Sequence, residues 1–185
     1  MKVLLGVSGG IAAYKACELT SLAVKAGHDV RVVMTANAAR FVGPLTFEGL
    51  SGNPVMTDTF ADAMAHIHWA KWADVAVVAP MSANVLGRLA CGLADDALST
   101  AFMALPRGIP VVLAPAMNTE MWFHPVVQRN VGWLRNLGRY TLMEPTEKRL
   151  ACGDVGPGAL PDPTDILAAV TAAAMSRPLQ GPTSA

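Results

Sequence analysis

The chain has 185 residues, a length typical of a single domain with one hydrophobic core. Its 14 basic and 14 acidic residues cancel, which removes the charge expected of a nucleic-acid binder or a polybasic membrane-surface protein. Hydrophobic residues make up 52% and charged residues only 15%, against about 25% in ordinary proteins, so disorder is excluded and a large interface or unusual burial is expected.

The predicted elements alternate between short β-branched runs and longer segments rich in Ala and Leu. Strands are expected at 2–7, 29–34, 75–80 and 110–114, with a weaker one at 140–143. Helices are expected at 11–26, 82–91, 96–104, 125–136 and 164–175. The strands lack strict polar alternation, which is typical of a parallel sheet buried on both faces. We therefore expect an α/β fold with a doubly wound parallel sheet, a three-layer arrangement of the Rossmann or flavodoxin type.

One domain is expected over residues 1–175, followed by a flexible tail at 176–185 that is rich in proline and small residues. The longest apolar runs, 75–81 and 109–117, are about half the length of a membrane span and contain proline. The glycines after residues 1–7 favour a first strand over a signal peptide, and so a cytoplasmic protein.

The chain has three cysteines and no CxxC spacing. This pattern supports neither a disulfide framework nor a structural zinc site, so each cysteine has a separate interpretation. Cys17 and Cys91 fall in apolar predicted helices and are expected to be packing residues. Cys152 lies in the glycine-rich segment 148–160, which is predicted to be an irregular lid-like loop, and its basic neighbours favour a reactive thiol. No metal site is expected.

A glycine-rich turn, residues 6–15, joins the first predicted strand to the first helix. Free backbone N–H groups and the helix dipole make this position suited to a phosphate. The spacing fits neither the dinucleotide fingerprint nor the Walker A motif. Thr35, Ala36 and Asn37 stand after the second strand, where a nicotinamide dinucleotide fold would place an acidic residue. A mononucleotide phosphate is therefore favoured over NAD.

Two further segments follow buried strands and should reach the same edge of the sheet. Residues 79–85 include Ser82, predicted as a helix N-cap, and Asn84, while residues 114–122 include Asn118, which is suited to binding a carboxylate. The segment 66–74, predicted as a loop, carries two histidines two residues apart. That spacing does not place them on one helix face, which disfavours a metal site and leaves general base chemistry open.

Taken together, residues 6–15, His66 with Ile67, and the segments 80–84, 115–122 and 151–158 resemble the homo-oligomeric flavin-containing cysteine decarboxylases, nearest to the phosphopantothenoylcysteine decarboxylases. The resemblance covers residues 1–175 in order. The family pattern Pro-Ala-Ser-Ala-Asn-Thr stands here as Pro-Met-Ser-Ala-Asn-Val at 80–85, so a role for a threonine hydroxyl at Val85 is in doubt.

The resemblance implies FMN as the cofactor, with FAD as the other flavin left open. It implies three sets of residues. The cofactor set is Ser8, Gly9, Gly10, Ile11, Thr35, Asn37, Ser82, Ala83, Asn84 and Ala116. The substrate set is Asn118, Met121, Arg149, Leu150 and Ala151. The catalytic set is His66 as base, Asn118 as carboxylate orienter and Cys152 as the final acid.

The implied reaction is decarboxylation of a cysteinyl carboxylate through a thioaldehyde and an enethiolate. The first candidate converts 4'-phospho-N-pantothenoylcysteine to 4'-phosphopantetheine in coenzyme A biosynthesis. The alternative acts on the C-terminal cysteine of a ribosomal peptide and forms an aminoenethiol. Family members assemble as trimers, or dodecamers of trimers, with the site between subunits. A flavin prenyltransferase and a non-catalytic phosphatase regulator are disfavoured by the cysteine segment and by the lack of an acidic tail.

Overall fold

A computed structural model describes residues 1–149 and 155–176 of the chain. Six parallel strands form one sheet in the order β3-β2-β1-β4-β5-β6, and β7 and β8 form an antiparallel hairpin beside it. The strands of the sheet are β1 (Lys2–Val7), β2 (Asp29–Met34), β3 (Val55–Met56), β4 (Val75–Met81), β5 (Val111–Pro115) and β6 (Tyr140–Leu142). The hairpin consists of β7 (Thr146–Arg149) and β8 (Val155–Ala159).

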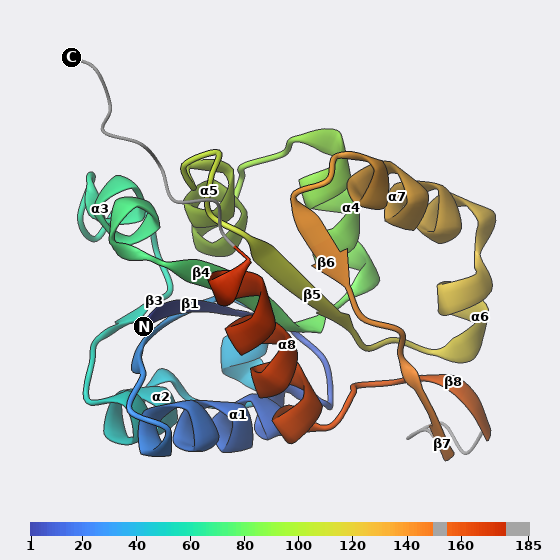
Figure 1. The fold of residues 1–185 in the computed structure, drawn as a ribbon, viewed down its shortest axis with the longest axis horizontal. Coiled ribbons are helices and arrows are strands. Elements are labelled where there is room, and N and C mark those ends of the chain that lie inside the picture. The colour runs from blue at the N-terminus through green and yellow to red at the C-terminus, as the bar shows by residue number, and fades with distance from the viewer. Residues whose placement is uncertain (150–154, 177–185) are drawn as a thin grey trace.

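Helices cover both faces of the sheet and make three layers (Figure 1). One face carries α1 (Ala13–Lys25), α2 (Pro44–Ser51) and α8 (Pro163–Met175). The other carries α3 (Ala65–Trp72), α4 (Ala83–Cys91), α5 (Ala97–Met103) and α7 (Pro125–Asn136). A 3-10 turn, η1 (Ala38–Arg40), follows β2, and the short α6 (Thr119–Phe123) follows β5. The predicted doubly wound α/β fold is confirmed.

The core lies in two clusters, one on each side of the sheet. Strands β4 and β5 are buried along their whole length, so their apolar runs serve both clusters. Leu86, Leu98 and Leu134 anchor the helices on one side, and Phe47 and Ile166 anchor those on the other. This two-sided burial explains why the strands show no polar alternation.

The predicted helix bounds agree with the structure to within a few residues. The first helix begins at Ala13 instead of 11, because the preceding residues form a turn in which the Ala13 N–H donates to Gly10 O at 2.9 Å. It ends before Gly27, whose φ of 80° is the left-handed conformation that glycine adopts readily. Ser82 caps α4 as expected, accepting a hydrogen bond from the Val85 N–H at 3.4 Å.

Three expectations from the sequence are wrong. The histidine segment is helix α3, because its apolar and aromatic side chains pack on the core although Met64 supplies no cap. The segment expected to be irregular contains the β7–β8 hairpin, whose backbone ladder forms despite its glycines. Cys91 is exposed at the end of α4 and does not pack, whereas Cys17 is half-buried, and burial raises the pKa of its thiol.

The strand order places β1 beside β4, although the chain first runs from β1 outward to β2 and β3. The direction of winding reverses between β1 and β4, and such a switch point leaves a crevice at the carboxyl ends of the strands. The predicted flexible tail lies outside the described residues, apart from Ser176. None of the helices in the described part of the chain is long and apolar enough to cross a bilayer.

Candidate active site

Ser8 joins the ends of β1 and β4 at the switch point. Its side chain is fully buried, and its hydroxyl donates to Pro80 O at 2.8 Å and accepts from the Ser82 N–H at 2.9 Å. A second bond runs from the Ser8 N–H to the same Pro80 carbonyl at 3.3 Å. The glycine turn and the β4–α4 segment, more than 70 residues apart in the sequence, are therefore one rigid unit at this edge.

The glycines after Ser8 differ in what surrounds them. A Cβ atom on Gly9 would lie 2.5 Å from Asn37 Cβ, so the turn after β1 is in close contact with the turn after β2. A Cβ atom on Gly10 would meet nothing within 4 Å. The start of α1 has neither a side-chain cap nor an acidic residue in its first turn, and Ile11 beside it is exposed. This arrangement leaves an open space in front of an uncapped helix N-terminus, which favours an anion.

The turn after β2 carries Thr35 and Asn37. Thr35 is buried, its N–H donates to Val7 O at 3.1 Å, and its hydroxyl accepts from the Ala38 N–H at 3.1 Å. Asn37 is exposed. Thr35 therefore shapes the turn, while the Asn37 side chain remains accessible above the glycine turn.

The ends of β4 and β5 supply the next part of the edge. Ala83 is half-buried against the core, whereas Asn84 is exposed in the first turn of α4. The Ala116 N–H donates to Met81 O at 3.0 Å, which ties the β5 end to the β4 end. Asn118 is the N-cap of α6, since its Oδ1 accepts from the Glu120 N–H at 2.8 Å. Cofactor and substrate candidates on β1, β4 and β5 thus follow one another along a single edge.

The β7–β8 hairpin packs against α6, a contact that sequence reasoning missed. The Met117 N–H donates to Gly158 O at 2.9 Å, and a Cβ atom on Gly156 would lie 3.0 Å from Thr119 Oγ1. That Thr119 oxygen is buried and has no hydrogen-bond partner among the described residues. The glycines in this segment were a sequence signal of close approach, but not of the surface approached.

The structure describes only some of the remaining candidates for substrate binding and for the final acid. Met121, on α6, is 47% exposed. Arg149 is the last residue of β7, and Lys148 beside it donates to Asp162 Oδ1 at 2.8 Å. This bond and the Lys148 charge hold the pKa of the Asp162 carboxyl below its usual range. Leu150, Ala151 and Cys152 lie outside the described residues.

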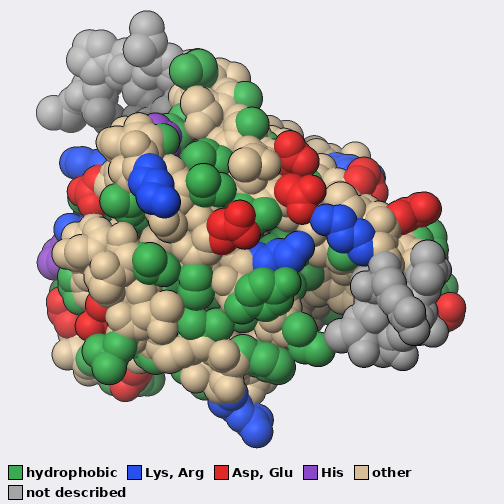
Figure 2. Space-filling view, turned by 90° about the horizontal axis from the view of Figure 1, so that it is seen from below, with side chains coloured by type: hydrophobic (Ala, Val, Ile, Leu, Met, Phe, Trp, Pro, Cys, Tyr) green, Lys and Arg blue, Asp and Glu red, His purple; other side chains and the backbone are tan. Residues whose placement is uncertain are grey.

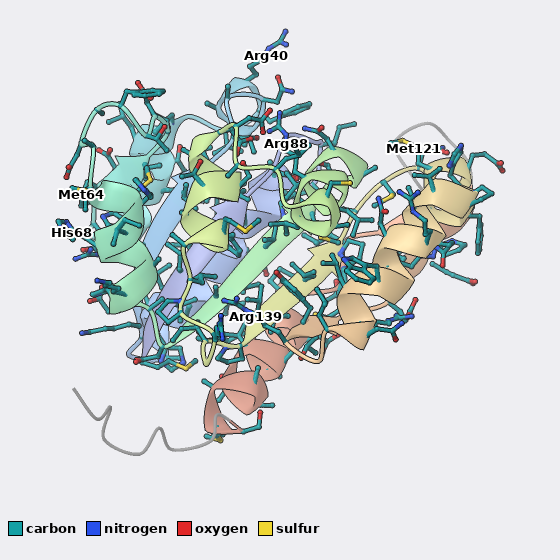
Figure 3. The ribbon with its side chains drawn as sticks, turned by 90° about the horizontal axis from the view of Figure 1, so that it is seen from above. Arg40, Met64, His68, Arg88, Met121 and Arg139 are labelled. Carbon is teal, nitrogen blue, oxygen red and sulfur yellow. The ribbon has the colours of Figure 1, made fainter. Side chains whose placement is uncertain are left out.

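His66 stands in the first turn of α3, and its Nδ1 atom is buried without a hydrogen-bond partner in the described part of the chain. His68 is exposed on the outer side of the same helix (Figure 3). Helices α3 and α6 lie at opposite ends of the molecule in both ribbon views, so His66 is far from Asn118 and Met121 in a single chain (Figures 1 and 3). The structure brings the cofactor candidates together but does not bring the base to the carboxylate orienter.

The sheet order, the braced glycine turn and the polar segments at the carboxyl edge define an α/β protein with an open space and an uncapped helix start at its switch point. The family model described as Flavoprotein matches residues 1–175. The chain belongs to this flavoprotein family. The family match and the predicted resemblance agree.

The curated relatives that are similar to the chain differ in how much of their own length it covers. The coenzyme A biosynthesis bifunctional protein CoaBC of Bacillus subtilis is 53% identical over 89% of the chain, but the match covers only 41% of that relative. The probable phosphopantothenoylcysteine decarboxylase of Streptococcus mutans is 46% identical, covering 87% of the chain and 92% of the relative. The chain thus spans about two fifths of the bifunctional relative and nearly all of the other.

Among solved structures, a PPC decarboxylase mutant complexed with pantothenoylaminoethenethiol has a TM-score of 0.82 and 37% identity, with 92% of this chain and 96% of that chain covered. The FMN-dependent cysteine decarboxylase SpaF has a TM-score of 0.81 and 35% identity, with 95% and 98% covered. Both likenesses extend over almost the whole fold.

Proposed function

We propose that this protein is an FMN-dependent cysteine decarboxylase that converts 4'-phospho-N-pantothenoylcysteine to 4'-phosphopantetheine. One observation carries the proposal: the segments after β1, β4 and β5 are bonded into a single edge at the switch point, in a chain that matches a probable phosphopantothenoylcysteine decarboxylase over nearly its full length. The bifunctional relatives are longer, so any activity beyond decarboxylation is outside this proposal.

The residues at the edge fit an FMN group. The open space at Gly10, the uncapped start of α1 and the absence of an acidic residue there suit a phosphate. Ser8, Gly9, Gly10 and Ile11 would hold that phosphate. The rest of the cofactor set would contact the remainder of the molecule, namely Thr35, Asn37, Ser82, Ala83, Asn84 and Ala116. Bound FMN would supply reversible two-electron oxidation of the substrate's thiol carbon, which gives the departing carboxylate an electron sink.

The chain's own residues would position the substrate and move protons. Asn118, held at the start of α6 by its bond to the Glu120 N–H, would orient the substrate carboxylate. His66 would take a proton during oxidation, since an imidazole can act as a general base. Cys152 would return the final proton. Met121 and Arg149, with Leu150 and Ala151, would complete the substrate contacts.

The active enzyme is proposed to be a homo-oligomer, a trimer or a dodecamer of trimers. The proposal is supported by the separation of α3 and α6: if His66 and Asn118 act on one substrate, a second copy would have to bring the two together. Figure 2 shows hydrophobic side chains gathered on the face formed by α1, α2 and α8. Large exposed hydrophobic residues near the start of α1 and in the 38–45 segment support an interface, namely Ile11, Tyr14, Phe41 and Leu45.

A peptidyl-cysteine substrate is the second candidate, because both substrates present a cysteinyl carboxylate and the likeness to SpaF, an FMN-dependent cysteine decarboxylase, does not distinguish them. The decisive experiment offers phosphopantothenoylcysteine and a cysteine-terminated peptide to the purified protein side by side and follows product mass. We expect loss of CO2 from phosphopantothenoylcysteine and a saturated phosphopantetheine product. Conversion of the peptide alone to an aminoenethiol would transfer the assignment to the second candidate.

Two variants test the assigned roles. His66→Asn should abolish the oxidation step, with His68→Asn as the matched control that leaves it intact. Cys152→Ser should stop the reaction at the enethiol product. Unchanged phosphopantetheine yield in either variant would remove that residue from the mechanism. We also place the enzyme in the cytoplasm, since a thiol substrate and the free Cys17 and Cys91 suit a reducing compartment.

A further inference from the structure

Helix α3, which carries His66, is short and depends on neighbouring elements for its position. Its eight residues make about two turns, too few for a stable isolated helix, so neighbouring elements must fix it. Only Ala70 is fully buried, and no side chain caps the first turn. The position of His66 therefore depends on a small number of tertiary contacts.

The contacts that fix α3 are concentrated toward its C-terminal end. Asp74, two residues beyond the helix, accepts from the Lys2 N–H at 2.7 Å through its carboxylate, and its own N–H donates to Lys2 O at 2.9 Å. The first turn has a different environment. Ala65 and Trp69 line a hollow of about 170 Å³ together with β3 and with Thr57, Asp58, Ala61 and Asp62. The first turn, which carries His66, is thus held by the bond from the Ala65 N–H to Asp62 O at 3.1 Å and borders this hollow.

Arg31 reaches α3 from β2 and contacts both of its tryptophans. Its guanidinium carbon lies 4.4 Å from the ring centroid of Trp72 and 5.4 Å from that of Trp69. The two rings are three residues apart, one turn along the same helix face. The Arg31 Nε atom is buried without a hydrogen-bond partner, and no carboxylate in the described part of the chain forms an ion pair with this arginine. Among the described residues, the aromatic faces of Trp69 and Trp72 are the partners of the Arg31 cation.

Trp69 connects the arginine to the histidine. It stands three residues after His66, so the two side chains are neighbours on the helix surface. One side of Trp69 faces Arg31, and the residue also lines the hollow beside the first turn. If the arginine is removed, Trp69 can turn into that hollow, and the turn that carries His66 loses its support.

We propose that Arg31 is a positioning residue for His66, acting through Trp69 and Trp72 to fix the orientation of α3. The inference rests on the proposed function only for its kinetic readout. The contact is specific to arginine, because a planar guanidinium stacks on ring faces whereas a lysine ammonium is a point charge.

The test compares Arg31→Met with Arg139→Met in the FMN-loaded protein. Arg139 is the control, since it also lies over an aromatic ring, that of Tyr140, and its Nε is buried without a partner among the described residues; its Nη2 in addition donates to Leu105 O and Pro106 O at 3.1 Å. It precedes β6, however, at the opposite side of the sheet from β2. We expect Arg31→Met to lower kcat for decarboxylation by about 10- to 100-fold while KM and FMN content stay near wild type. Arg139→Met should leave kcat within about 3-fold, as expected for a change far from the reacting groups.

Two further measurements distinguish the positioning of His66 from a general loss of folding. Arg31→Lys should restore kcat only in part, and it also serves if Arg31→Met does not fold. The ring C–H resonance of His66, assigned with His66→Asn, should shift in Arg31→Met and not in Arg139→Met, and this readout needs no turnover. Failure of the wild-type protein to release CO2 would overturn the proposed function alone. A wild-type kcat in Arg31→Met, an equal loss in Arg139→Met, or an unmoved His66 resonance would overturn the positioning role.

Discussion

Substitution of Gly9 by alanine tests whether the turn after β1 is held against the turn after β2. The added Cβ would lie 2.5 Å from Asn37 Cβ and 2.9 Å from the Asn37 backbone carbon. Carbon atoms pack best at about 3.5–4.0 Å, so the overlap is about 1 Å. A rotamer change cannot relieve a clash with backbone, and one of the two turns must move. Overpacking of this kind costs about 1–3 kcal/mol, which we expect as the loss in free energy of unfolding for Gly9→Ala.

Gly10→Ala, at the neighbouring residue, is the matched control. It should change the free energy of unfolding in the opposite direction. A Cβ atom there meets nothing within 4 Å, and φ at Gly10 is not positive, so the folded chain accepts alanine without strain. Alanine also restricts the unfolded chain, which should raise the free energy of unfolding by about 0.4–1 kcal/mol. Urea titrations of the two variants and wild type, all FMN-free and at equal protein concentration, measure both effects.

FMN binding by the same two variants distinguishes an effect on the cofactor site from an effect on folding stability. If the open space at Gly10 receives the FMN phosphate, a methyl group there should weaken FMN binding although the protein is more stable. Flavin fluorescence during titration with FMN measures this loss. Equal destabilisation by the two substitutions, or a wild-type urea midpoint for Gly9→Ala, would refute the packing argument. Wild-type FMN affinity in Gly10→Ala would refute the phosphate assignment.

Other predictions concern the polar contacts that brace the site. Ser8→Ala leaves the Ser82 N–H without its partner and should lower the free energy of unfolding by about 1–3 kcal/mol. Thr20→Val is the control: it removes a buried hydroxyl bonded only within α1 and should lower that free energy by less than about 1 kcal/mol. Equal losses for the two variants in urea titrations would contradict this prediction. Lys148 lowers the pKa of Asp162 in the folded chain, so this stabilisation is present above the unfolded pKa of about 4 and is lost as pH falls through the folded value. Asp162→Asn should therefore lose less thermal stability than wild type on acidification, and identical melting temperatures across that range would contradict the linkage.

The layers of the fold can be predicted from the pattern of apolar residues along the chain. The runs at β1, β4 and β5 are apolar without alternation, which only a sheet covered on both faces can bury, and the Ala- and Leu-rich segments between them supply the covering helices. Local chemistry also determined the helix ends at Ser82 and Gly27. These features depend on residues near each other in the chain, so they are readable without the tertiary structure.

The tertiary structure alone decided the contacts between distant segments. The hairpin β7–β8 pairs backbone with backbone, and Gly156 lies close to Thr119 on another element, so the local pattern signals neither the pairing nor the surface that the glycine approaches. Helix α3 forms because its tryptophans pack on Arg31 and the core, which overrides a segment with no capping residue. Composition gave a chain with few charges. In the structure, several large apolar side chains are exposed. His66 and Asn118 lie at opposite ends of the molecule, because the strand order that creates the switch point also separates α3 from α6.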